Sequence, residues 1–90
     1  MNIDILGKKE EKIKMQKMGL AMQRAAEAIS LQVTINYTHN FNQYSGSSMN
    51  PAQSPHVFIE GNLEISGMVP PMVLIQTKLA EYRDKRSQAY

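Results

Sequence analysis

The feature that most restricts the fold of this chain is a proline-free stretch of helix-forming residues, Glu10 to Ile29, between two short β-like runs. Its apolar residues recur at spacings of three and four, which places them on one face of an amphipathic helix. These residues are Met15, Met18, Met22, Ala25 and Ile29. Gly19 interrupts the stretch at a cost of about 1 kcal/mol relative to alanine, too little to overturn the pattern. We therefore expect a helix of about five turns.

The runs on either side of this helix have the pattern of strands. Ile3–Leu6 is a short apolar run that Gly7 stops. Leu31–Tyr37 alternates apolar and polar residues and is rich in β-branched side chains. Two strands joined by a helix form a βαβ unit, whose strands pair in parallel through a right-handed crossover.

The next part of the chain predicts a loop and a hairpin. Residues 38–54 are rich in Asn, Gln, Ser and Gly, which is typical of a loop, with one weak helical turn near Phe41–Tyr44. Two further β-like runs, Val57–Glu60 and Leu63–Ser66, are separated by Gly61-Asn62. This pair tolerates the positive φ of a two-residue turn, so we expect the two runs to pair as antiparallel strands.

A second helix is predicted from Met72 to about Lys85, where Ile75, Leu79 and Tyr82 recur at helical spacing. Two prolines come just before it, and proline is tolerated in a first helical turn because its missing N–H would have no partner there. The predicted order is β-α-β-loop-β-β-α, an α/β fold with a four-stranded mixed sheet. A chain of 90 residues suits a single domain spanning 1–90.

The composition argues against several classes of protein. A hydrophobic content of 42% and a charged content of 20% disfavour a disordered chain, and a net charge of +2 is too small to predict a nucleic-acid partner. The start Met1–Asp4 lacks the basic region of a secretory signal, so a cytoplasmic location is expected. The longest apolar run, Met68–Ile75, contains two prolines and is too short to span a bilayer, so we expect no membrane insertion.

Three motifs connect the chain to a known family. Ile5-Leu6-Gly7 ends the first strand, Ser54-Pro55 precedes the third, and Ser66–Pro70 leads into the last helix. In this order they resemble the small thioredoxin-like redox proteins of archaea and bacteria, a group that includes redox-active disulfide and glutaredoxin-like proteins. The resemblance implies a thioredoxin-like fold and a cis peptide bond between Ser54 and Pro55. It also implies a peptide-binding surface, formed by Gly7, Ser54, Pro55 and His56, that presents backbone groups to an extended chain.

The chain departs from this family where the chemistry would be. The relatives carry Cys-x-x-Cys at the start of the first helix, which aligns here with Glu10, Glu11, Lys12 and Ile13. The chain contains no cysteine, and thiol–disulfide exchange needs a thiolate, so the family's activity does not carry over. The loop at 38–54 also stands where the relatives have a helix.

No catalytic, cofactor or metal site is expected from the other residues. Glu10 and Glu11 are adjacent, point to different sides of a helix and make a poor acid–base pair. The methionine stripe is more typical of a core than of a Cu(I) site, and His39 and His56 have no second ligand at a recognisable spacing. The lysines around the first helix alternate with acids and favour a solvated face over a phosphate-binding one: Lys8, Lys9, Lys12, Lys14 and Lys17.

Five apolar residues stand outside the expected core: Met68, Val69, Met72, Val73 and Leu74. The stripe of Ile75, Leu79 and Tyr82 already covers one side of a sheet, and three consecutive helical positions cannot all face the same core. We predict an interface here, with a second copy of the chain or with another protein, unless the segment 38–54 covers these side chains.

Together these features favour a redox-inactive thioredoxin-fold module that holds a protein or peptide without covalent chemistry. Two alternatives stay open. One is an enzyme that uses the same cleft with non-thiol residues, which is disfavoured because the sequence shows no nucleophile–base pair. The other is a purely structural, degenerate subunit.

Overall fold

The computed structural model describes residues 1–44 and 53–87, in which helices and strands alternate much as the sequence predicts. In chain order the elements are β1 (Asn2–Leu6), the short 3-10 helix η1 (Lys9–Glu11), α1 (Lys12–Ala28), β2 (Thr34–Thr38), the 3-10 helix η2 (Phe41–Tyr44), β3 (His56–Ile59), β4 (Asn62–Ser66) and α2 (Met72–Ser87). The expected helical turn after β2 is thus present as η2. Of the predicted loop at 38–54, residues 45–52 lie outside the described residues.

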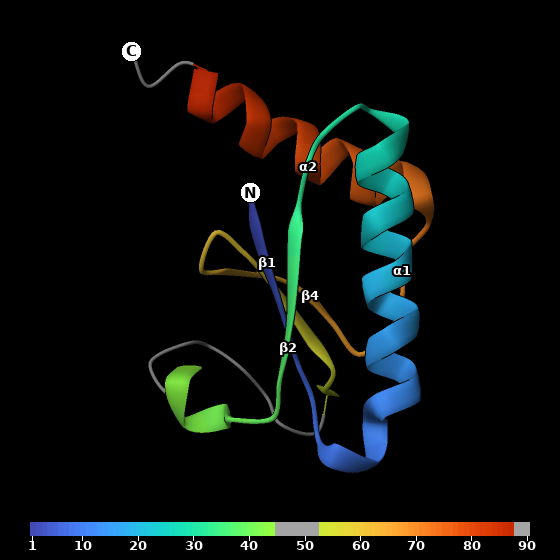
Figure 1. The fold of residues 1–90 in the computed structure, drawn as a ribbon, viewed down its shortest axis with the longest axis vertical. Coiled ribbons are helices and arrows are strands. Elements are labelled where there is room, and N and C mark those ends of the chain that lie inside the picture. Colours follow the sequence, from blue (N-terminus) through green and yellow to red (C-terminus); the bar gives the residue numbers. More distant parts are fainter. Residues whose placement is uncertain (45–52, 88–90) are drawn as a thin grey trace.

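The four strands form one mixed sheet in the order β2-β1-β3-β4 (Figure 1). β1 and β2 are parallel neighbours, with Ile3 opposite Ile35, as the βαβ pattern predicts. β3 runs antiparallel to both β1 and β4. The Ser54–Pro55 peptide bond, just before β3, is cis, as the resemblance implies. The α/β class and the four-stranded mixed sheet are therefore confirmed.

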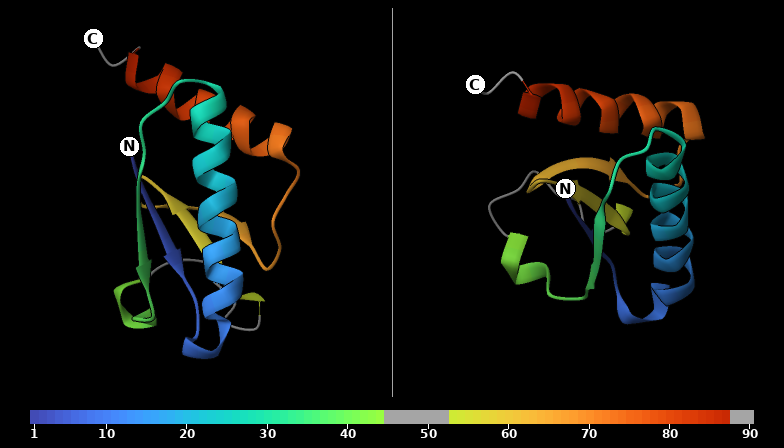
Figure 2. Two further views of the ribbon diagram at one scale, coloured as in Figure 1. Left: turned by 45° about the vertical axis from the view of Figure 1, so that its right-hand side comes forward. Right: turned by 45° about the horizontal axis from the view of Figure 1, so that its top comes forward.

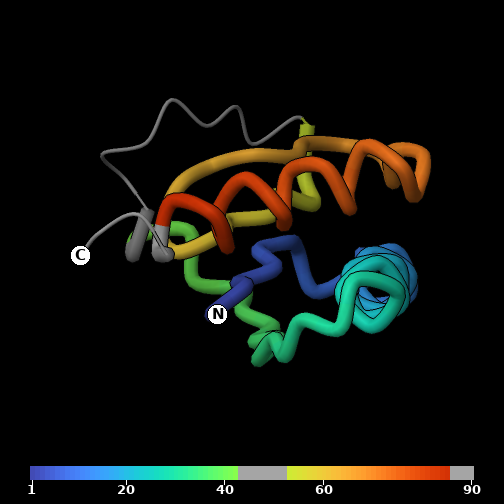
Figure 3. The backbone as a smooth tube through the Cα atoms, turned by 90° about the horizontal axis from the view of Figure 1, so that it is seen from above, coloured from blue at the N-terminus to red at the C-terminus, as the bar shows by residue number. Residues whose placement is uncertain are grey.

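Both helices cover the same face of the sheet. Side chains alternate along a strand, and the inner set from β1 and β3 packs with the apolar stripes of α1 and α2. This core contains Ile3, Ile5, Met15, Met18, Met22, Ala25, Ala26, Val57, Ile59, Ile65, Ile75 and Leu79, with Tyr82 packed against it. Figure 2 shows both helices beside the sheet, and Figure 3, seen from above, shows α1 end-on and α2 lengthwise, so the two helices cross. The predicted stripes of both helices are confirmed as core.

The first helix ends in a hydrogen-bonded cap, and because of this cap the second strand begins later in the chain than predicted. Ser30 has a positive φ of 54°, its N–H bonds to Glu27 O, and the Leu31 N–H bonds to Ala26 O at 2.9 Å. These are the two hydrogen bonds of a Schellman cap. Leu31 therefore belongs to the helix end, and β2 begins at Thr34. The prediction of a strand starting at Leu31 was wrong by three residues.

The hairpin turn is shifted by one residue from its predicted position. Ile59 pairs with Asn62, so the two turn residues are Glu60 and Gly61, with φ of 49° and 85°. A two-residue turn of this kind needs positive φ at both positions, and glycine meets that need at the second. Asn62 instead begins β4. The Asn2 N–H donates to Glu60 Oε1, which ties the turn to the start of β1.

A polar contact joins the last helix, α2, to the strand β4. The Tyr82 hydroxyl donates to Glu64, and the Lys78 ammonium lies 3.3 Å from the same carboxylate. Burial, together with the hydrogen bond to Glu64, raises the pKa of Tyr82 to about 12. This contact holds the C-terminal half of α2 over the sheet.

Gly19 is explained by the close approach of Tyr37. A Cβ atom at Gly19 would lie 2.8 Å from Tyr37 Cζ, nearer than side chains tolerate. The phenol ring, which projects from β2, thus occupies the place where a side chain on α1 would stand. The helix accepts the conformational cost of glycine because the ring packs there.

We predict that Gly19→Ala fails to stabilise the wild-type chain but stabilises a Tyr37→Ala chain. Alanine in a helix interior is favoured over glycine by about 1 kcal/mol, and only removal of the ring leaves room for the methyl group. The four free energies of unfolding, measured in urea, form a double-mutant cycle. A gain of the full amount from Gly19→Ala alone would show that the ring does not restrict this position.

Candidate functional site

Three connecting segments meet at one end of the sheet, around the position that the resemblance marks. They follow β1, precede β3 and follow β4. Leu6 is paired with His56, and His56 with Ser66, across β1, β3 and β4. The Gly67 N–H donates to Pro55 O at 2.9 Å, so the segment after β4 is fixed to the proline.

The four residues of the predicted peptide-binding surface lie together here, but they are buried. Pro55 and His56 are fully enclosed, Ser54 is 8% exposed, and Gly7 is also buried. A Cβ at Gly7 would lie 2.8 Å from Met15 Sδ and 3.4 Å from Pro55 Cβ, so glycine allows these side chains to pack closely. His56 Nδ1 lies 2.8 Å from Ser66 Oγ. These four residues therefore pack beneath the surface of the site, and neighbouring residues form that surface.

The segment that the resemblance aligns with Cys-x-x-Cys, Glu10–Ile13, is mostly exposed at the start of α1. Glu10 and Glu11 belong to η1, while Lys12 and Ile13 begin α1, and the Ile13 side chain is 69% exposed. Glu11 is the exception among these residues, because its side chain turns inward. Its Oε1 atom accepts the Lys8 N–H at 2.9 Å and the Ser54 hydroxyl at 2.6 Å.

Glu11 therefore ties the segment after β1 to the segment before β3. Partial burial raises the pKa of its carboxyl, but the hydrogen bonds from Ser54 and the Lys8 amide, with the charges of Lys8 and Lys14, outweigh this and bring the pKa below its ordinary value. The charged form is thus the one that the fold stabilises. Sequence analysis did not connect Glu11 with Ser54, since nothing local indicates a partner 43 residues away.

We predict that Ser54→Ala lowers the free energy of unfolding by about 1 kcal/mol at about pH 7, because it removes a hydrogen bond to a carboxylate. It should also raise the pKa of Glu11 towards its ordinary value. The stabilisation is complete above the unfolded-state pKa and is lost as the pH falls through the lowered folded-state pKa, so wild type and variant converge in acid. Urea unfolding at several pH values and an NMR titration of the Glu11 carboxyl measure both effects. Glu10→Gln, on the exposed side of η1, is the control and should show neither.

Beside this junction a shallow apolar hollow opens to solvent. It has a volume of about 180 Å³ and lies between α1, Pro55 and the segment after β4. Its lining consists of Lys14, Lys17, Met18, Pro55, Gly67, Met68 and Val69. Pro55, although enclosed, thus reaches the wall of a surface depression.

A second hollow, of about 300 Å³, continues along α1. It is lined by Lys17, Leu20, Ala21 and Arg24 on the α1 side and by Val69, Pro70, Met72 and Ile75 on the other. Lys17 and Val69 border both hollows, so the two adjoin each other, and together we call them the α1 groove. One wall carries the cations of α1, and the other is apolar.

The predicted interface residues are exposed and divide into two groups. Met68, Val69 and Met72 line the α1 groove, and Met68 is 74% exposed. Val73 and Leu74 are also exposed, at 69% and 54%, but line neither hollow. The structure therefore shows the apolar surface that the sequence predicts. What covers this surface stays a prediction.

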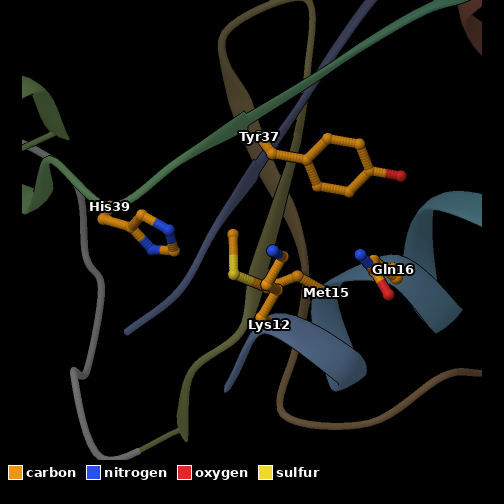
Figure 4. A pocket seen from close by; sticks show the side chains of 5 residues that line it. All are labelled: Lys12, Met15, Gln16, Tyr37 and His39. Atoms are coloured by element: carbon orange, nitrogen blue, oxygen red, sulfur yellow. The ribbon is translucent and has the colours of Figure 1, made fainter. Parts of the chain in front are cut away.

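A separate hollow of about 460 Å³ lies on the other side of α1, against β2 (Figure 4). Lys12, Met15 and Gln16 face it from α1, and Tyr37 and His39 from β2 and the residue after it. His39 Nδ1 lies 2.8 Å from Gly7 O, so in the neutral ring this nitrogen donates and Nε2 is left as the acceptor. Sequence analysis gave none of these side chains a common site, because they come from two separate segments.

The residues of the α1 groove that sequence analysis missed are Lys14, Lys17, Leu20 and Arg24. The lysines had been interpreted as part of a solvated helix face. Their spacing of three and four residues, beside the Met18 and Met22 stripe, is the signal that places them along one edge of the core-facing side.

Residues 1–44 and 53–87 contain no group of three or more His, Asp or Glu side chains that could hold a metal ion. Nor do these ranges include a helix long and apolar enough to cross a membrane. Compared with models of protein families, with curated proteins and with solved structures, the chain matches none.

Proposed function

We propose that this chain is a cysteine-free, thioredoxin-like module that holds a segment of another protein without covalent chemistry. The observation that carries the proposal is the open apolar hollow bordered by Pro55, Gly67 and Met68, next to the segment where the relatives carry their thiols. A protein segment seated there would contact Met68, which the folded chain leaves largely exposed.

The thioredoxin-like part of the proposal is supported by the arrangement of the sheet and the segments after it. The parallel β1–α1–β2 unit stands beside an antiparallel β3–β4 hairpin, and α2 follows on the same face as α1. Glu10 and Ile13 lie where the first helix begins, so their side chains occupy positions suited to a redox-active pair.

The binding part is supported by the way the site is built. The hydrogen bonds of Glu11 with Ser54 and of Gly67 with Pro55 fix all three segments around the hollow. A surface that is ordered before binding loses less entropy when a partner is held. Exposed methionine side chains also adapt to different apolar partners.

We predict that the double variant Glu10→Cys/Ile13→Cys gains thiol chemistry that other cysteine pairs lack. A thiol at a helix N-terminus has a lowered pKa and reacts faster, and three-residue spacing allows a disulfide. The matched control is Glu81→Cys/Asp84→Cys, with the same spacing on the exposed face of α2. Alkylation rates across pH should show a lowered thiol pKa in the first pair only. Equal reactivity of the two pairs would count against the thioredoxin-like alignment.

Peptide binding is tested with a random peptide library displayed on phage and selected on the full chain. We predict that enriched peptides bind Met68→Lys at least about tenfold more weakly than wild type, because a buried methionine contact is worth about 1.5–3 kcal/mol. Val73→Lys is the matched control, since it makes the same change at an exposed apolar residue outside the hollows, and it should bind as wild type does. A library that yields no peptide sensitive to Met68→Lys would refute the proposal.

A further inference from the structure

The two walls of the α1 groove differ in charge. Lys14, Lys17 and Arg24 border one side, and no acidic side chain is among the described residues that line either hollow. Lys17 and Arg24 form no salt bridge with another described residue. All three cations are exposed, so each is available to a bound partner.

The opposite wall offers only apolar contact. Met68, Val69 and Met72 are exposed there, and Leu20 adds an apolar side chain between the cations of α1. A bound segment would therefore meet positive charge on one side and apolar surface on the other. The complementary ligand carries acidic side chains on one side and apolar side chains on the other.

We propose that the α1 groove selects an acidic, amphipathic segment of a partner protein. This inference rests on the proposed function and adds the chemistry of the partner. The cations attract and orient the segment, and the apolar wall holds it through Met68 and Met72. The charge pattern sets which segments bind, and the apolar contact supplies most of the holding energy.

Two other occupants fit the groove less well. A second copy bound through the same groove would present the same lining on both sides, and the described residues of that lining include no acidic side chain to pair with the cations. A nucleic acid would satisfy the cations through its phosphates but would leave the apolar wall without complementary contact. An acidic, apolar segment satisfies both walls.

The deciding experiment uses the peptides enriched on the full chain. We expect them to combine acidic and apolar residues and to bind Lys17→Glu/Arg24→Glu about tenfold more weakly than wild type. The matched control is Lys9→Glu/Lys12→Glu, which changes the net charge equally at exposed positions outside the groove and should change affinity little.

A peptide with its acids replaced by lysine should regain affinity for Lys17→Glu/Arg24→Glu and bind wild type poorly. Circular dichroism of each variant checks that the fold is kept.

The other outcomes separate this inference from the proposed function. Peptides that are sensitive to Met68→Lys, but neither acidic nor sensitive to Lys17→Glu/Arg24→Glu, would overturn the inference and leave peptide binding standing. A dimer of the chain alone that Lys17→Glu/Arg24→Glu dissociates in sedimentation would make a second copy the occupant. Displacement of the peptides by a mixed-sequence single-stranded oligonucleotide would make nucleic acid the occupant. Both of these results would overturn the inference, and a library without enriched peptides would overturn the inference and the proposed function together.

Discussion

The packing of α1 against the sheet is the contact on which the rest of the structure depends. Met15, Met18 and Met22 fill the space between this helix and the inner side chains of β1 and β3. The close approach needs the absence of a side chain at Gly7, where Met15 packs, and at Gly19, where Tyr37 packs. α2 then crosses α1 and adds Ile75 and Leu79 to the same core.

This packing also determines where the surface depressions lie. A single helix lies along the sheet, so one of its sides faces β2 and the other faces α2 and the segment before it. The first side borders the hollow with Tyr37 and His39, and the second borders the α1 groove. The cations of α1 thus acquire different neighbours according to their position: Lys12 faces the β2 side, whereas Lys17 faces Met72 and Val69.

The parts of the fold that could be predicted from the sequence are those with a local periodic signal. The stripe from Met15 to Ala25 and the stripe of Ile75 and Leu79 identified both helices and their buried faces. The predicted boundaries were wrong where hydrogen bonds at the end of a helix or strand determine which residue ends the element. At the end of α1, the Leu31 N–H takes part in the helix cap, so β2 cannot begin at Leu31. In the hairpin, the pairing of Ile59 with Asn62 fixes the register and leaves Glu60 and Gly61 as the turn residues.

The site was predictable only as a location. The motifs brought Gly7, Ser54, Pro55 and His56 to one place, but alternation and spacing do not show that all four are buried by the segments around them. The bond between Glu11 and Ser54 joins residues 43 positions apart, and no local pattern indicates such a pair. The α1 groove likewise forms only because tertiary packing brings α1 next to the segment before α2. The local sequence pattern does not show this contact.

Under the proposed function, the absence of thiols changes how the site can hold a partner. A mixed disulfide fixes a partner through one bond, whatever surrounds it. Without that bond, affinity must come from buried apolar area and complementary charge, and specificity from the penalty of leaving charges unpaired. Glu11 is already paired with Ser54 inside the fold, so it offers little to a partner, whereas the cations of α1 and the side chains of Met68 and Met72 are still open to contact. Under the proposed function, binding is therefore determined by the α1 groove and not by the segment Glu10–Ile13.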